Sequence, residues 1–221
     1  MKVCTDATLF GAMAPIGGGE KVLDIGAGTG LLSLMAAQLG AGEVTAVELM
    51  QESNAEAATN FSNSPWADRL TAVHQDIRDF ARECDKHFDL IISNPPFFDN
   101  HSRSAEGDRS TARHNDQLPY AELLQAVDKL LAEEGLFYLL IPVHAADALA
   151  QSATEHGLYL KRRTDIRGYD HNKPKVSAMV FGRTPGPVEV KLLTIYSSQN
   201  VYGPESTKYL SDFLLRFSSP A

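Results

Sequence analysis

Segments with the pattern of β-strands alternate with segments of helical periodicity along most of this chain. The strands are predicted at 21–25, 44–47, 70–74, 88–93, 136–141, 159–164, 176–181 and 188–195, and the helices at 31–39, 51–62, 79–86, 120–131, 145–156 and 205–217. Because alternating strands and helices build right-handed crossovers, this order predicts an α/β fold with a mostly parallel sheet and helices on both faces. Segments 159–164 and 176–181 are expected to pair with each other.

The length and composition are those of an ordinary globular protein. With 221 residues the chain can bury one good hydrophobic core, and we expect a single domain over 1–221. No run of about 18 uncharged apolar residues is present, and the N-terminal segment lacks the basic and apolar parts of a signal peptide. Cys4 and Cys84 are too few for a disulfide framework or a metal-binding knuckle. We therefore expect a cytoplasmic protein without a membrane span, a metal or an obligate protein partner.

The net charge of −8 argues against a general nucleic-acid binder, but the basic residues are unevenly distributed. Segment 158–191 holds eight of the 20 Lys and Arg residues against three acidic residues. An acidic protein with a local basic stripe can bind one shaped RNA without coating all nucleic acid. We interpret 158–217 as the RNA side of the protein. The candidate contacts in it are Lys161, Arg162, Arg163, Lys173 and Lys175.

The residues that follow the first four predicted strands carry the candidate site, because ligands of parallel sheets bind outside the carboxyl ends of the strands. The first turn reads DIGAGTG, in which Gly26, Gly28 and Gly30 let the backbone approach a ligand closely. Its spacing differs from the G-x-G-x-x-G of dinucleotide-binding proteins, which disfavours a nicotinamide-dependent dehydrogenase. Asp24, ahead of the glycines, suits a cationic ligand such as an aminoacyl ammonium or a sulfonium.

Two acidic residues follow at the ends of the next strands. Glu48 lies 18 residues after Gly30, where a carboxylate can accept hydrogen bonds from both hydroxyls of a ribose. Asp76 can accept a hydrogen bond from the amino group of an adenine, and Ile77 offers a backbone amide and apolar cover. Leu49 completes this predicted cofactor-binding set. Taken alone, each acid could equally be a solvated side chain or a helix cap, so the prediction depends on the whole series.

Asn94-Pro95-Pro96-Phe97 directly follows the apolar strand FDLIIS and is the most specific motif of the chain. The double proline ends the strand rigidly, and Pro96 fixes the turn beside the substrate. The side-chain oxygen of Asn94 and the carbonyl of Pro95 can both accept hydrogen bonds from one NH₂ group. Phe97 offers a face on which a planar base can stack, which contributes about 1–3 kcal/mol. We therefore expect Asn94, Pro95 and Phe97 to be catalytic, with Asn94 also beside the cofactor.

A polar segment of 20 residues, 98–117, follows this motif. Segments of this length without predicted structure are usually lids, binding loops or disordered. It carries Arg103, Arg109 and Arg113, and arginine can bind a phosphate through two parallel hydrogen bonds. We expect a lid that orders on RNA, and a merely solvated loop is the open alternative.

These motifs resemble the class I, Rossmann-like methyltransferases that use S-adenosylmethionine to methylate amino groups. The chain is most similar to the tRNA1(Val) (adenine(37)-N6)-methyltransferases, which modify the adenine beside the anticodon. The segments that carry this second resemblance are 2–6, 64–67, 93–97, 112–114 and 202–213. The resemblance implies a mostly parallel seven-stranded sheet with a C-terminal antiparallel strand pair, S-adenosylmethionine as the cofactor and the anticodon loop of a tRNA as the partner. It also implies that Thr5 and Asp6 line the cofactor pocket.

Other functions remain compatible with the same motifs. The pocket at Asn94 could serve a protein-glutamine N5 methyltransferase or an rRNA guanine-N2 methyltransferase, and the former would not need the basic stripe. A DNA adenine methyltransferase fits less well, because 221 residues leave no room for a separate recognition domain. A non-catalytic protein that binds S-adenosylmethionine would have no use for amine acceptors at this position.

Overall fold

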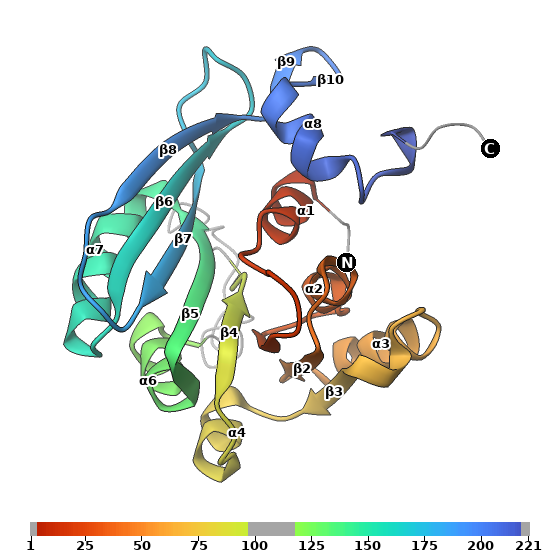
Figure 1. The fold of residues 1–221 in the computed structure, drawn as a ribbon, viewed down its shortest axis with the longest axis vertical. Helices are drawn as coiled ribbons and strands as arrows, with labels where there is room; N and C mark the ends of the chain where they lie inside the picture. The colour runs from red at the N-terminus through yellow and green to blue at the C-terminus, as the bar shows by residue number, and fades with distance from the viewer. Residues whose placement is uncertain (1–3, 97–117, 218–221) are drawn as a thin grey trace, which may run out of the picture.

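A sheet of eight strands runs through the centre of the molecule (Figure 1). The structure, a computed structural model, describes residues 4–96 and 118–217. In chain order the strands are β1 (Lys21–Ile25), β2 (Glu43–Glu48), β3 (Leu70–His74), β4 (Phe88–Ser93), β5 (Leu131–Pro142), β6 (Tyr159–Arg167), β7 (Val176–Gly182) and β8 (Glu189–Thr194). Their order in the sheet is β3-β2-β1-β4-β5-β7-β6-β8. All neighbours are parallel except β7, which runs antiparallel to both β5 and β6.

Helices cover both faces of this sheet. Among the described residues they are α1 (Thr5–Ala12), α2 (Leu31–Leu39), α3 (Gln51–Ser62), α4 (Ile77–Glu83), α6 (Tyr120–Leu130), α7 (Val143–Glu155) and α8 (Pro204–Leu210), with 3₁₀ turns η1 (Ala67–Arg69) and η2 (Leu215–Phe217). Helices α1, α2, α3 and α8 contribute to one core cluster, and α4, α6 and α7 contribute to the other. Successive strand residues alternate between the two clusters, as at Phe137 and Tyr138 of β5, because neighbouring side chains of a strand point to opposite faces.

The α/β fold predicted from the alternating pattern is confirmed, and so is the antiparallel pairing of 159–164 with 176–181. The strand number differs from the seven that the family resemblance implies. Glu189–Thr194 adds an eighth strand, because it pairs in parallel with β6 at the edge of the sheet. A separate antiparallel pair, β9 (Tyr196–Ser198) and β10 (Val201–Tyr202), follows it. None of the described helices is long and apolar enough to cross a membrane.

Two helices differ from the sequence prediction by more than a few residues. The predicted helix 205–217 ends at Leu210, and the chain then turns so that Phe213 and Phe217 fold back against the core. Helix α1 was not predicted. It is buried over Ala7–Ala12 on all sides and therefore has no polar face to produce an amphipathic pattern.

Candidate active site

The carboxyl ends of four parallel strands meet at one edge of the sheet. The register aligns the last residues of β1 with those of β2 and β4, and the last residues of β2 with those of β3. The predicted site residues at these ends therefore lie in a row, in the order Asp76, Glu48, Gly26 and Asn94. Because neighbouring strands are about 4.8 Å apart, the row is roughly 15 Å long. The strand order thus brings motifs that are up to 70 residues apart in the sequence together into one site.

The three glycines after β1 have different surroundings. Gly26, Gly28 and Gly30 have φ angles of 71°, 57° and 85°, in the left-handed region that side chains disfavour. A Cβ atom on Gly30 would lie 2.4 Å from a ring carbon of Phe61, so this glycine allows α3 to pack closely on the turn. A Cβ atom on Gly26 would meet no heavy atom within 4 Å. Gly26 therefore leaves open space at the sheet edge, which we call the open floor, whereas the absence of a side chain at Gly30 allows close packing.

Asp24 is the buried acid beneath this turn, with 1% of its surface exposed. Its Oδ2 atom accepts a hydrogen bond of 2.7 Å from the hydroxyl of Ser33, whereas Oδ1 is buried and has no partner among the described residues. Burial raises the pKa of Asp24 to about 6; the Ser33 hydrogen bond opposes this rise, and the nearby charge of Glu48 adds to it. A buried acceptor without a donor is costly unless a ligand supplies one. Ser33 was not predicted from the sequence as a site residue, although it lies in the helix directly after the glycines.

Glu48 is held between the glycine turn and the start of α3. Its Oε2 atom accepts a hydrogen bond from the amide of Gly28 at 2.7 Å, and its Oε1 atom accepts one from the amide of Met50 at 2.8 Å. Only 8% of Glu48 is exposed, whereas the neighbouring Leu49 is 41% exposed. Each carboxylate oxygen has two acceptor positions, so the two amides fix the side chain and leave acceptor capacity for hydroxyl groups.

Asp76 caps the N-terminus of α4 and binds the side chain of Arg78. Its Oδ1 atom accepts hydrogen bonds from the amide and Nε of Arg78 at 2.8 and 2.9 Å, and its Oδ2 atom forms an ion pair with the same guanidinium. This contact lowers the pKa of Asp76. Arg78 also reaches Glu122 of α6 at 3.0 Å, a bridge that the sequence did not indicate. The carboxylate keeps one acceptor position on Oδ2, and the adjacent Ile77 is buried in the core.

The Asn94 motif begins where β4 is fixed to β1. The hydroxyl of Ser93, the last residue of β4, donates a 3.0 Å hydrogen bond to the carbonyl of Ile25 at the end of β1. Asn94 and Pro95 are half-buried and Pro96 is exposed. The side chain of Asn94 has no hydrogen-bond partner among the described residues, so its oxygen is an available acceptor at this edge. Phe97 and the predicted lid, with Arg103, Arg109 and Arg113, lie outside the described residues.

The first turn of α1 approaches the same edge from the N-terminal side. Thr5 Oγ1 lies 3.3 Å from the hydroxyl of Tyr196 in β9, within hydrogen-bond distance. The pKa of Asp6 is raised by burial, and the positive charge of Lys175 partly offsets this rise. Thr5 and Asp6 therefore lie beside the turn that joins β6 and β7.

The basic residues of the C-terminal part are divided between the two edges of the sheet. Lys161 and Arg183 lie at the amino edge, where Lys161 donates to Thr184 at 2.9 Å and Arg183 forms an ion pair with Asp128 at 2.8 Å. Lys173 and Lys175 lie in the turn at the carboxyl edge, and both are exposed. The basic residues of segment 158–191 therefore do not form one surface, because β6 and β7 connect the two edges of the sheet and carry these residues to both.

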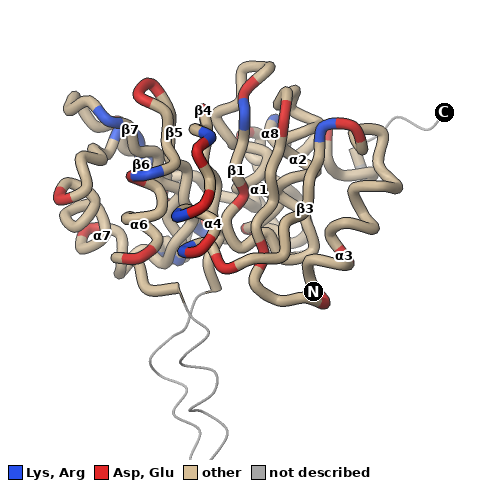
Figure 2. Tube along the Cα trace, turned by 90° about the horizontal axis from the view of Figure 1, so that it is seen from below, with Lys and Arg blue, Asp and Glu red and all other residues tan. Residues whose placement is uncertain are grey.

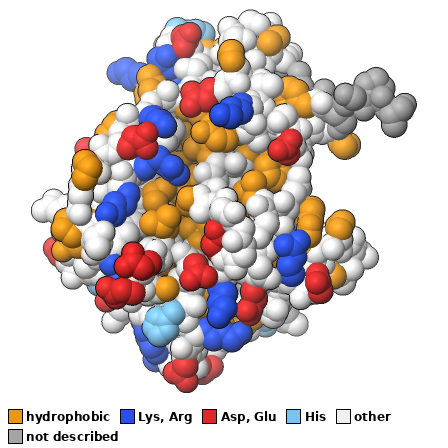
Figure 3. All heavy atoms as spheres, viewed as in Figure 1, with side chains coloured by type: hydrophobic (Ala, Val, Ile, Leu, Met, Phe, Trp, Pro, Cys, Tyr) orange, Lys and Arg blue, Asp and Glu red, His pale blue; other side chains and the backbone are white. Residues whose placement is uncertain are grey.

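Neighbouring arginines of β6 also point to opposite faces. Arg163 forms ion pairs with Asp147 of α7 at 2.6 Å and with Asp165 at 2.7 Å, whereas Arg162 makes no ion pair with a described residue. Acidic and basic residues alternate in short stretches along the chain (Figure 2). In the space-filling view, Lys and Arg side chains gather over β6 and β8, next to a central area of hydrophobic side chains (Figure 3). No group of three His, Cys, Asp or Glu residues in the described ranges is arranged to hold a metal ion.

Comparison with known sequences finds similar proteins over nearly the whole chain. Residues 7–139 match the family described as methyltransferase small domain. A tRNA1(Val) (adenine(37)-N6)-methyltransferase of Trichodesmium erythraeum is 38% identical over 220 residues, which cover 98% of this chain and 92% of that protein. A protein of the same name from Flavobacterium psychrophilum is 37% identical, with 98% of this chain and 93% of that protein covered.

Solved structures with low sequence identity share the fold. A crystal structure of a predicted O-methyltransferase from Agrobacterium tumefaciens matches with a TM-score of 0.71 at 15% identity, over 93% of this chain and 95% of that one. The glycopeptide N-methyltransferase MtfA, solved in complex with S-adenosyl-L-methionine, matches with a TM-score of 0.58 at 17% identity, over 80% of this chain and 86% of that one.

Proposed function

The chain belongs to the tRNA1(Val) (adenine(37)-N6)-methyltransferase family, and we propose that it transfers a methyl group from S-adenosylmethionine to the N6 amine of adenine 37 in a tRNA. The observation that carries this proposal is the position of Asn94. Its side-chain oxygen is an available acceptor at the end of β4, one strand away from the open floor at Gly26. An amine acceptor beside a ligand floor is the arrangement that amine methylation requires. Because the substrate is a tRNA, we expect the protein to act in the cytoplasm.

The residues at the sheet edge fit this cofactor. The unpartnered Oδ1 atom of Asp24 can accept a hydrogen bond from the ammonium of the methionine part. The family resemblance assigns Thr5 and Asp6, at the start of α1, to the same pocket. Glu48, fixed by two backbone amides, can accept hydrogen bonds from the ribose hydroxyls. The remaining acceptor position of Asp76 suits the adenine amino group, with Leu49 and Ile77 as apolar cover. When bound, S-adenosylmethionine would supply an electrophilic methyl group on a sulfonium; its S–CH₃ bond would break and S-adenosylhomocysteine would leave.

The contribution of the protein to the reaction is mainly positioning. The exocyclic amine of adenine is a poor nucleophile, because its lone pair is delocalised into the ring. The side-chain oxygen of Asn94 and the carbonyl of Pro95 can accept hydrogen bonds from the two N–H groups of this amine and direct its lone pair out of the ring plane. Holding two reactants in this way can correspond to an effective molarity of about 10⁵–10⁸ M. No strong base is needed, because the nitrogen becomes acidic once it is methylated and then loses a proton to water.

A loop nucleotide of RNA suits this site better than a paired one. The target base must leave its stack to reach Asn94, and unstacking costs least in a single-stranded loop. We propose that Phe97 and Pro96 stack against the base, and that Arg103, Arg109 and Arg113 of the segment after them contact phosphates. Lys173 and Lys175, exposed at the same sheet edge, add positive charge there.

Methylation of a tRNA1(Val) transcript tests the proposal. The wild-type protein, labelled S-adenosylmethionine and unmodified transcript should produce N6-methyladenosine at one position, detected by mass spectrometry of the digested RNA. A transcript with purine riboside in place of adenine 37 lacks the amine and should remain unlabelled. Label in a protein glutamine but in no RNA would overturn the assignment of the substrate.

A further inference from the structure

Five aromatic rings form a row at the carboxyl edge of the sheet, outside the strand-end site. In the order Phe217, Tyr202, Tyr196, Tyr169 and His171, neighbouring ring centres are 5.7, 5.1, 5.3 and 5.6 Å apart. The rings come from η2, β10, β9 and the turn between β6 and β7. We call this row the aromatic ladder. Its outer two rings, Tyr169 and His171, are stacked and only 9° from parallel.

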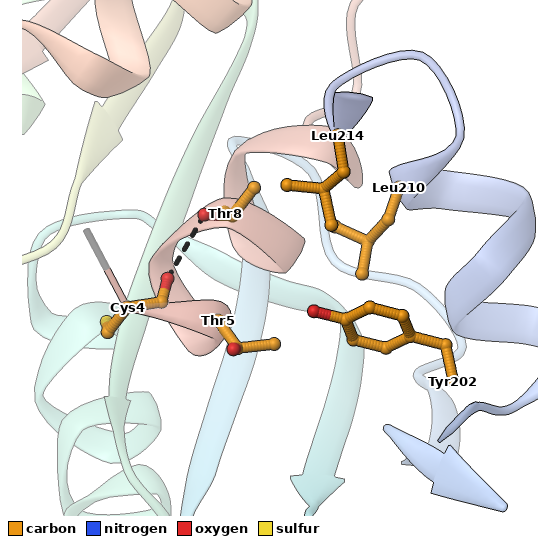
Figure 4. A pocket seen from close by; sticks show the side chains of 6 residues that line it. All are labelled: Cys4, Thr5, Thr8, Tyr202, Leu210 and Leu214. Atoms are coloured by element: carbon orange, nitrogen blue, oxygen red, sulfur yellow. Dashed lines mark hydrogen bonds between the residues drawn. The ribbon is translucent and has the colours of Figure 1, made fainter. Parts of the chain in front are cut away.

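Core packing explains the inner rings of the ladder but not the outer ones. Phe217, Tyr202 and Tyr196 pack against the core cluster that contains α1 and α8. The ring of Tyr202 projects toward α1, beside a cavity of about 120 Å³ (Figure 4). Tyr169 and His171 are in neither core cluster of the described residues, and His171 is exposed. The half-buried Tyr169 is in contact with Tyr196, whereas the exposed ring of His171 stacks on Tyr169 outside both core clusters.

The turn that carries the outer rings is fixed by hydrogen bonds. Arg167 donates to the carbonyl and to Oδ1 of Asp170, both at 2.7 Å, and to the hydroxyl of Thr194 at 2.9 Å. The amide of Tyr169 donates to Oδ1 of Asn172 at 3.0 Å. A ligand that meets side chains already held in place does not have to order them, which favours binding. The outer rings are therefore preorganised for a planar partner.

The ladder lies close to the proposed site of methylation. The turn ends at Lys175, whose carbonyl accepts a 3.0 Å hydrogen bond from the amide of Val143, the first residue of α7 after β5. The turn begins after β6, which is three strands away from β4, and ends at β7, which is two strands away, so the lateral distance is about 10–15 Å. Lys175 is also near enough to Asp6 of α1 to influence its pKa. A nucleotide that flanks the target base can reach the ladder while the target lies at Asn94.

The charge around the outer rings favours RNA. Lys173 and Lys175 are exposed, and neither makes a side-chain hydrogen bond or ion pair with a described residue. The acid of the turn, Asp170, is already bound by Arg167. In a protein with a net charge of −8, this turn is thus a local site for a polyanion.

We propose that the aromatic ladder is a stacking platform for the anticodon loop, on which a base other than the methylated adenine continues the row beyond His171. Lys173 and Lys175 contact the phosphates of that nucleotide. The inference rests on the proposed function and adds a second binding position for the same RNA. Single-stranded RNA is commonly recognised by bases that stack on Tyr, Phe and His rings. Stacking here would hold the loop open and direct the target base toward Asn94.

Kinetics on an anticodon stem-loop test the platform. His171→Ala and Tyr169→Ala should raise the KM for RNA by about 5- to 150-fold, the range that corresponds to roughly 1–3 kcal/mol per stacked base. The kcat and the affinity for S-adenosylhomocysteine should stay at the wild-type value, and His171→Phe should restore the KM. His87→Ala and Tyr159→Ala are the matched controls. They remove the same ring types at the amino edge of the sheet and should change neither constant.

Abasic RNA shows whether the rings act by stacking. Each loop nucleotide other than the target is replaced in turn by an abasic one. At one position the KM of wild type and His171→Ala should become equal, because the base that stacks is gone. The platform would be refuted if both ladder variants kept the wild-type KM on intact RNA. It would also be refuted if the KM of His171→Ala stayed above that of wild type on every abasic RNA. A wild-type protein that methylates no RNA would instead refute the proposed function.

Discussion

Replacing Gly30 by alanine should destabilise the protein more than the same replacement at Gly26. Both glycines have a left-handed backbone, with φ angles of 85° and 71°. A Cβ atom on Gly30 would lie 2.4 and 2.8 Å from two ring carbons of Phe61 and 3.3 Å from the Cβ of Ala57. On Gly26 it would have no heavy atom within 4 Å. The two variants therefore share a backbone cost, and only Gly30→Ala adds a steric one.

The magnitudes follow from these contacts. A side chain in the left-handed region costs about 1–2 kcal/mol. Phe61 is 3% exposed and cannot move into solvent, so Gly30→Ala also overpacks the core, at a cost of about 1–3 kcal/mol. The free energy of unfolding should fall by about 2–5 kcal/mol for Gly30→Ala and by about 1–2 kcal/mol for Gly26→Ala. In a protein of this size, those values correspond to melting temperatures lower by roughly 4–20 °C and 2–8 °C.

Two measurements on the same pair of proteins separate packing from binding. Scanning calorimetry without ligand gives the melting temperatures, and titration calorimetry with S-adenosylhomocysteine gives the affinities. Gly26→Ala should weaken binding at least about tenfold, or 1.4 kcal/mol, because its methyl group fills the open floor of the proposed cofactor site. Equal melting temperatures for the two variants would refute the packing argument from Phe61. Wild-type affinity of Gly26→Ala would show that this floor is not part of the cofactor site.

Three further predictions concern the acid, the amine acceptor and the basic turn. Folded Asp24, with its pKa of about 6, keeps its proton to a higher pH than the unfolded chain, where the value is 3.8. The free energy of unfolding should therefore fall by about 3 kcal/mol as the pH rises from 3.8 to about 6. Urea denaturation at a series of pH values should show this decrease, and Asp24→Asn should not show it. Asn94→Ala should bind S-adenosylhomocysteine normally yet lower the single-turnover methylation rate about a hundredfold, with Asn94→Asp milder; a wild-type rate would exclude the motif from the reaction. Lys173→Glu and Lys175→Glu should each lower the slope of log K against log salt for RNA binding by about 0.7–0.9. Lys161→Glu, at the amino edge, should leave this slope unchanged. Equal slopes for all three variants would contradict the placement of the RNA at the carboxyl edge.

Local sequence patterns were sufficient to predict the layers of the fold and the motifs at the strand ends. The glycine turn after β1 and the prolines after β4 interrupt apolar segments, so the ends of these strands could be predicted closely. Helix α1 could not be predicted, because a helix buried on every side lacks the polar face that produces a periodic signal. The strand at 188–195 was predicted, but its parallel pairing with β6 was not, because strand order depends on pairing between distant segments rather than on local pattern.

The sequence by itself determined which residue types stand at the carboxyl ends of the strands, because polar residues and glycines there follow directly from the pattern. Only the tertiary structure decided which of them are still available to a ligand. Asp76 binds Arg78 and keeps one acceptor position, whereas Asp24 keeps an oxygen with no partner among the described residues. The basic stripe of the sequence is likewise divided by the height of the sheet, and rings as distant in the chain as Tyr169 and Phe217 join one row. The physical reason is that solvation, ion pairing and stacking act between side chains that are close in space, and chain folding alone sets those distances.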